Sequence, residues 1–195
     1  MERRDLLRAF ASATALIVLP NERALAAWSR VATGERSPNG LSDAHIGLVR
    51  AIADTIIPRS DTPSATDVGV HAFVDVIVSE QLAEAERAAG LAGLDAINAR
   101  ALSLGNDVFM NLSPEMRGKV IESLESGARD VEPAKTYWQL KGLIIHGYFT
   151  SEPVMKDVLK TIVMPGKFEG AAPITIKKRP STTLTPPSEA GHAHG

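Results

Sequence analysis

The sequence predicts an all-α protein: a compact helical domain of about five or six helices, with an N-terminal signal and linker before it and an extended arm after it. Three observations support this fold class. Apolar residues recur at helical spacing along most of residues 41–170. Serine, proline and glycine stand where these stretches begin and end. No stretch alternates polar and apolar residues convincingly, as a half-buried strand would; residues 174–176 come nearest.

Two helices joined by a bend are expected at the centre of the domain. Ser42 is predicted to cap the first helix, over residues 43–57, and Pro58 prevents that helix from continuing. A turn rich in proline, serine, threonine and aspartate follows, at residues 58–69. The second helix is predicted over residues 70–89. Both helices carry an apolar stripe, so the stripes should face one core.

The remaining helices are marked by their ends. Gly90 and Gly93 are expected to loosen the chain before a third apolar stripe, which Gly105 can stop. The run Ser113-Pro114-Glu115 is typical of a helix start, with a capping serine, a proline in the first turn and an acid near the positive end of the helix. The later helices are expected to end at Gly127, at Thr150 and near Ile162.

Residues 1–26 have the pattern of a secretory signal of the twin-arginine kind. Arg3 and Arg4 form a charged start, residues 9–19 form a short apolar run, and Ala24-Leu25-Ala26 fits a small-x-small cleavage site. The apolar run is well short of the roughly 20 residues that a membrane helix needs, so no stable membrane span is predicted. The alternative is an uncleaved amphipathic helix that stays on the protein.

A twin-arginine signal predicts export to the periplasm, and that route carries folded cargo. The segments that flank the helical domain are expected to lack a core of their own. Residues 27–40 are polar, contain glycine and proline, and are interpreted as a linker. Residues 171–195 show no periodicity and are interpreted as an extended arm that becomes ordered only against another surface.

Composition narrows the function classes. The chain has 195 residues and 44% apolar residues, which indicates one globular domain with tails. Its net charge of −2 gives no basic face for nucleic acid, so no nucleic-acid partner is predicted. The sequence contains no cysteine, which removes disulfides, thiol catalysis and iron–sulfur ligation by this chain.

No catalytic, cofactor-binding or metal site is predicted. His45, His71 and His146 lie in three different predicted helices and lack the close spacing of a two-histidine metal site. Asp54 lies among apolar neighbours, so one alternative hypothesis is a stand-alone periplasmic enzyme that uses Asp54 with His71 or His146 as acid and base. A further alternative is a general scaffold or binding module of the cell envelope.

Several short stretches resemble the gluconate 2-dehydrogenase subunit 3 family. The resemblance runs in order from about Leu41 to Pro173, behind a twin-arginine leader. The stretches that carry it are residues 52–58, 61–63, 67–70 and 73–75, then 147–151 and 165–170.

The resemblance implies a small, cofactor-free and non-catalytic subunit. Members accompany a large FAD-dependent sugar or polyol dehydrogenase of the glucose–methanol–choline type, and glucoside 3-dehydrogenases use similar small subunits. The small subunit often supplies the export signal and supports the folding of the catalytic subunit, and a cytochrome c commonly takes the electrons. Aromatic residues are favoured interface anchors. The residues expected to contribute to the interface, together with the arm, are His146, Tyr148, Phe149, Pro165 and Phe168.

Overall fold

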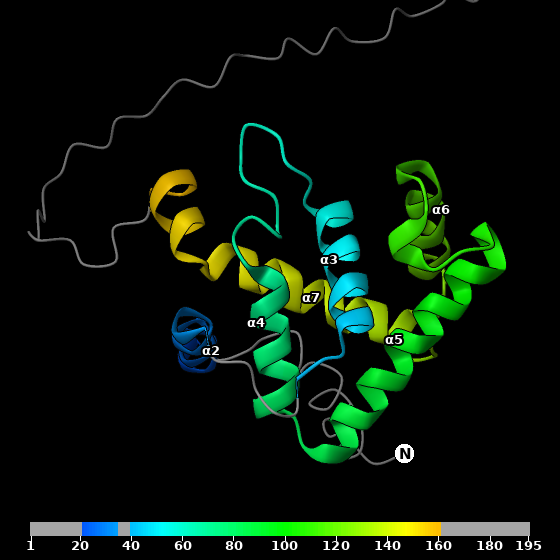
Figure 1. Ribbon diagram of the computed structural model, residues 1–195, viewed down its shortest axis with the longest axis horizontal. Helices are drawn as coiled ribbons and strands as arrows, with labels where there is room; N and C mark the ends of the chain where they lie inside the picture. The colour runs from blue at the N-terminus through cyan, green and yellow to red at the C-terminus, as the bar shows by residue number, and fades with distance from the viewer. Residues whose placement is uncertain (1–20, 35–39, 161–195) are drawn as a thin grey trace, which may run out of the picture. The chain divides into compact units, whose positions relative to one another are not determined.

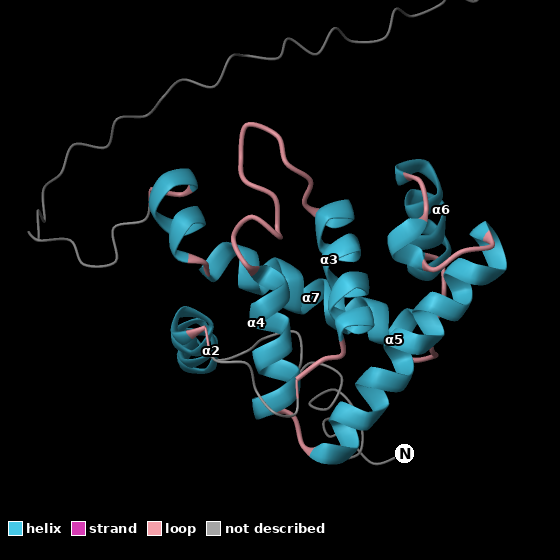
Figure 2. Cartoon of the chain, viewed as in Figure 1, coloured by secondary structure: helices cyan, strands magenta, loops and turns pink. Residues whose placement is uncertain are grey.

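The computed structural model describes residues 21–34 and 40–160. The α-helices in these ranges are α2 (Asn21–Thr33), α3 (Asp43–Ile56), α4 (Val70–Val76), α5 (Glu84–Gly105), α6 (Pro114–Glu125) and α7 (Ala134–Thr150). Shorter helical segments are η1 (Ile77–Gln81), η2 (Phe109–Asn111) and η3 (Val154–Val158). These ranges contain no strand (Figure 2), which confirms the predicted all-α class.

The predicted helix–bend–helix unit is confirmed. The Ser42 side chain accepts a hydrogen bond from the backbone N–H of His45 at 3.2 Å, as an N-cap does. The helix α3 ends at Ile56, just before Pro58, and the chain turns back into α4. The two helices contact each other and bury their apolar sides in one core.

The bend between α3 and α4 is fixed by its own polar side chains. The Asp67 carboxylate accepts the backbone N–H of Ser64 at 2.8 Å and pairs with the Arg59 guanidinium at 2.6 Å. Gly69 closes the bend at φ 80°, a backbone angle that glycine adopts without steric cost. The chain therefore enters α4 in a defined direction.

The predicted end of the second helix, at residue 89, is wrong. The chain leaves helical geometry at Leu82 and Ala83, whose backbones are extended, and α5 then runs straight through Gly90 and Gly93. Gly93 belongs in this helix because α5 approaches α7 closely there: a Cβ atom at Gly93 would lie 1.9 Å from the Thr136 hydroxyl oxygen. The glycine serves a close contact between helices rather than a loosening of the chain.

The predicted linker at residues 27–40 is wrong over residues 27–33, which form the second half of α2. Ala24 and Ala27 are fully buried, and the Trp28 ring stacks on the Phe73 ring of α4 with 5.1 Å between centroids. This spacing is helical, but small alanine side chains give a weak apolar signal in the sequence. Residues 1–20 and 35–39 lie outside the described residues.

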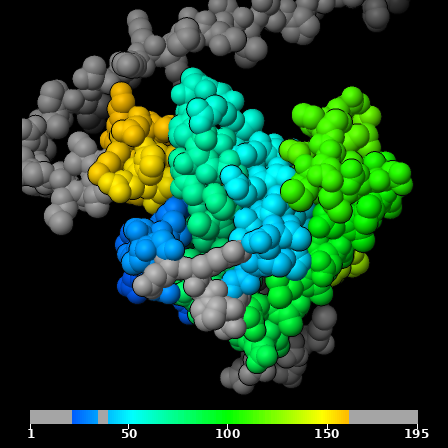
Figure 3. Space-filling model, viewed as in Figure 1, coloured from blue at the N-terminus to red at the C-terminus, as the bar shows by residue number. Residues whose placement is uncertain are grey.

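The helix α7 lies at the centre of the described domain. It packs against α4 and α5 and also contacts α2, α3 and α6. Figure 1 shows it (yellow) running across α3 and α4. On the face seen in Figure 3, α3 (cyan) lies between α4 and the segment of α5 and α6 (green). The largest fully buried side chains include Tyr137, Phe73, Phe109, Leu48 and Ile52.

Candidate functional site

The predicted functional residues divide into two groups. Those outside the described residues are Arg3, Arg4, Pro165 and Phe168. The predicted arm, residues 171–195, lies outside them as well. For all of these the sequence-based expectation stays a prediction. The structure places the others on the last turns of α7: His146, Tyr148 and Phe149.

Tyr148 points into its own domain. Its side chain is buried, and its hydroxyl donates a hydrogen bond to the backbone carbonyl oxygen of Pro63 at 2.9 Å. This bond holds the end of α7 against the bend between α3 and α4. Tyr148 therefore stabilises the fold of this chain, and its ring is not exposed as a surface anchor.

His146 is half-buried on the side of α7 that faces α4. Its ring lies 6.4 Å from the Phe73 ring, centroid to centroid. Burial lowers the pKa of this imidazole, so it is neutral at neutral pH. Its Nε2 atom is buried and has no hydrogen-bond partner among the described residues. Its apolar contact with Phe73 makes His146 part of the helix packing.

Phe149 lies on the outside of α7. Its side chain is 48% exposed, and Ile145, one helical turn earlier, is 38% exposed. Residues four apart lie on the same face of a helix, so these two form one apolar strip. The sequence-based interpretation missed Ile145; its position four residues before Phe149 is the signal that could have identified it.

The chain continues from α7 into η3, where more apolar side chains reach solvent. Val154 is buried and anchors η3 against α7, whereas Val158 and Leu159 are exposed. Exposed apolar side chains that form a patch mark interaction surfaces more often than isolated ones do. We refer to Ile145, Phe149, Val158 and Leu159 as the α7–η3 surface. These four side chains belong to two consecutive parts of the chain.

The Asp54 carboxylate forms hydrogen bonds that hold the fold together. One carboxylate oxygen accepts the backbone N–H of Thr66 at 3.0 Å, and the other accepts the Thr66 hydroxyl at 2.6 Å. Both bonds join α3 to the bend. Burial lowers the pKa of the nearby His71 imidazole, so this group is a neutral base near a carboxylate whose two oxygens already accept hydrogen bonds from Thr66. The geometry supports a structural role for Asp54 rather than acid–base catalysis.

A cation–aromatic cluster between α6 and α7 was not predicted from the sequence. The Arg129 guanidinium lies 4.0 Å from the centre of the Trp138 ring, and the Lys141 ammonium lies 4.9 Å from it. Lys141 also pairs with Glu125 at 2.6 Å, and the Tyr137 hydroxyl donates to the same carboxylate at 2.7 Å. These two hydrogen bonds lower the pKa of Glu125. The cluster joins α6 to α7.

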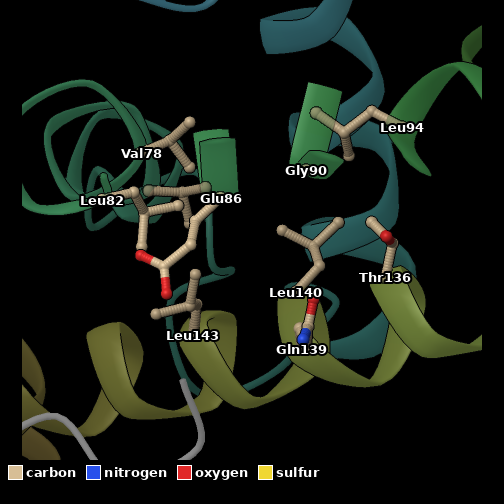
Figure 4. A pocket seen from close by; sticks show the side chains of 10 residues that line it. Val78, Leu82, Glu86, Gly90, Leu94, Thr136, Gln139, Leu140 and Leu143 are labelled. Atoms are coloured by element: carbon tan, nitrogen blue, oxygen red, sulfur yellow. The ribbon is translucent and has the colours of Figure 1, made fainter. Parts of the chain in front are cut away.

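A hollow opens between α4, η1, α5 and α7 (Figure 4). Its walls are mainly leucine and valine side chains, with Glu86, Thr136 and Gln139 as polar members. The Glu86 carboxylate is already used, because it accepts the backbone N–H of Ala83 at 3.2 Å at the start of α5. A sugar needs several polar partners for its hydroxyl groups. The hollow is therefore better suited to an apolar side chain than to a sugar.

Two negative findings concern residues 21–34 and 40–160. Within these ranges, no group of three or more His, Asp or Glu side chains is arranged to hold a metal ion. No helix there combines the length and the apolar character needed to cross a membrane.

The fold and these contacts define a small all-α protein with an apolar surface at its last described helices. A family model described as gluconate 2-dehydrogenase subunit 3 matches residues 43–166, and the chain belongs to this family. The match confirms the resemblance found in the sequence. It covers α3 to α7 and η3, and so includes the α7–η3 surface. The family name describes a subunit of a dehydrogenase complex. No curated protein and no solved structure matches the chain.

Proposed function

We propose that this chain is the non-catalytic small subunit of a periplasmic, FAD-dependent sugar or glucoside dehydrogenase of the glucose–methanol–choline type. The FAD belongs to the catalytic partner, and a cytochrome c is the expected electron acceptor of the complex. The observation that carries the proposal is the family match over residues 43–166. The Arg3-Arg4 leader supports the second part of the role, which is to help the flavoprotein fold and to export it by the twin-arginine route.

The α7–η3 surface is the proposed contact with the flavoprotein. Ile145 and Phe149 share one face of α7 within it, and aromatic side chains are common anchors of protein interfaces. Tyr148 supports this surface from behind, because its hydroxyl bond to Pro63 fixes the turn of α7 that carries Phe149. The Tyr148 ring also packs edge-on against the Phe149 ring, 5.4 Å between centroids. The anchor is therefore held in place before a partner arrives, which lowers the entropic cost of binding.

Co-expression with FAD-dependent dehydrogenases of the glucose–methanol–choline type from the same genome tests the proposal. We expect the two chains to purify together, with flavin absorbance in the complex. The double variant Ile145→Ser/Phe149→Ser should release most of the flavoprotein while the helical content stays unchanged. Leu102→Ser is the matched control, because Leu102 is similarly exposed but lies on α5. A monodisperse monomer that never retains a flavoprotein would contradict the proposal, and a stable complex without flavin would favour a general envelope scaffold.

The export role has a separate test. Replacing both Arg3 and Arg4 by lysine should keep the flavoprotein in the cytoplasm together with this chain, because the twin-arginine route reads the arginine pair. The surface variant Ile145→Ser/Phe149→Ser should itself be exported but leave the flavoprotein in the cytoplasm. Flavoprotein in the periplasm in both cases would show that it travels without this subunit.

A further inference from the structure

One face of helix α2, from Ala24 to Val31, is docked on the rest of the domain. Ala24 and Ala27 are fully buried, and Trp28 stacks on Phe73 with an interplanar angle of 26°. These residues are spaced three and four apart, so they form one face of the helix. That face contacts both α4 and α7.

Polar contacts hold both halves of α2 to the body. In the first half, the Gln81 side-chain amide donates to the backbone carbonyl oxygen of Arg23 at 3.1 Å. In the second half, the Trp28 indole N–H donates to the Thr150 hydroxyl at 3.1 Å, across 122 residues of sequence. The Arg30 guanidinium also pairs with Glu80 at 3.1 Å. The helix is therefore fixed on either side of its midpoint.

The sequence-predicted cleavage site lies at that midpoint. Ala24-Leu25-Ala26 is helical here, and the bond after Ala26 joins it to the buried residue Ala27. Proteases act on backbone that has opened locally, so cleavage requires α2 to leave its position and unwind. Cleavage would also leave only residues 27–33, about two turns, to hold the Trp28 contacts.

We propose that the leader is not removed after Ala26 and that α2, from Asn21 onward, stays in the exported protein as part of its fold. The inference rests on the proposed export in a folded state. In a chain that folds before export, α2 is already docked. The Ala26–Ala27 bond is therefore protected when the chain reaches the signal peptidase. The structure thus favours the uncleaved alternative that the sequence left open.

Intact-mass spectrometry of the full chain, purified with its flavoprotein from the exporting host, tests this inference. We expect the mass to include residues 21–26. In Trp28→Ala, which removes both the ring stacking and the bond to Thr150, the fraction cleaved after Ala26 should rise several-fold. Ser29→Ala is the matched control, because Ser29 is exposed on the same helix; it should match the unaltered chain.

Two results would overturn the inference. One is an exported, unaltered chain that begins at Ala27; this measurement needs no variant and does not depend on whether Trp28→Ala folds. The other is equal resistance to cleavage in the unaltered chain and in a folded Trp28→Ala protein, because docking would then not be the cause. Either result can occur while the flavoprotein still co-purifies. Failure of the proposed function would instead appear as absence of the flavoprotein, whatever the N-terminus.

Discussion

The Tyr148 hydroxyl lies 2.9 Å from the backbone carbonyl oxygen of Pro63, 85 residues earlier in the chain. This hydrogen bond joins the last turn of α7 to the bend between α3 and α4. Residues 61–63 and 147–151 are two of the stretches that carry the family resemblance. The fold therefore brings these two stretches into direct contact. This contact is a common structural reason for both stretches to be part of the family pattern.

Tyr148→Phe should lower the free energy of unfolding by about 1 kcal/mol, because it removes one partly buried hydrogen bond and leaves the Pro63 carbonyl without this donor. Urea denaturation measures the change. Phe149→Leu, at the exposed neighbouring position, should leave the stability almost unaltered. Equal stability of Tyr148→Phe and the unaltered chain would show that the bond contributes nothing.

Gly93→Ala should destabilise the protein by about 1–3 kcal/mol, because the added Cβ atom meets Thr136 on α7. Gly90→Ala is its matched control on the same helix, with no atom within 4 Å of the added carbon. The stability of that control should be unchanged, or its free energy of unfolding should rise by up to about 1 kcal/mol because alanine has a better helix propensity than glycine. Thermal or chemical denaturation of the two variants decides the matter, and equal stabilities would contradict the close contact between α5 and α7.

Asp54→Ala should cost about 2 kcal/mol, because the backbone N–H and the hydroxyl of Thr66 both lose their acceptor. Asp54→Asn keeps one acceptor oxygen and should cost less. Asp61→Ala, at an exposed aspartate of the same bend, serves as the control. Denaturation of all three variants gives the ranking. A fully stable Asp54→Ala protein would return Asp54 to the list of candidate catalytic acids.

Asp67 should titrate far below an ordinary aspartate. The Arg59 side chain, with help from the Ser64 backbone N–H, lowers the pKa of this carboxyl to about 2. A pKa lowered in the folded state stabilises the fold above the ordinary value of about 4, and this contribution is lost as the pH falls toward about 2. NMR titration of the side-chain carboxyl should therefore show a midpoint near 2.

Arg59→Gln checks the cause of that shift. The pKa of Asp67 should rise in this variant and yet stay below the ordinary value, because Ser64 still donates. Arg59→Lys keeps the charge and should preserve part of the shift. The difference in melting temperature between the unaltered chain and Arg59→Gln should shrink between about pH 4 and pH 2. A difference that stays constant over this range would contradict the pairing.

Local signals in the sequence predicted the parts of the fold that depend on neighbouring residues. Ser42 and Ser113 cap helices because a short hydroxyl side chain reaches the exposed N–H groups of the next turn, as observed for both. Pro58 ends α3 for a similarly local reason. The all-α class follows from such signals together with apolar periodicity.

The errors arose where distant contacts decide the outcome. Gly93 is compatible with a loop or a helix, and its close approach to Thr136 on α7 explains why a glycine stands inside α5. Tyr148 and Phe149 are adjacent aromatic residues of similar size, but one faces the bend and the other faces solvent. Helix α2 was missed because its buried side is mostly alanine. It is held in place by distant contacts: Trp28 stacks on Phe73 and donates a hydrogen bond to Thr150.

The position of Phe73 has a practical consequence for producing this protein. Its ring is covered by Trp28, and Gly147 approaches it so closely that a Cβ atom there would lie 2.7 Å from the ring. A recombinant version that starts after Thr33 would uncover this ring and deprive Thr150 of its indole donor. Such a truncation would be prone to aggregate. Expression should therefore begin no later than Asn21, and purification tags belong upstream of that residue.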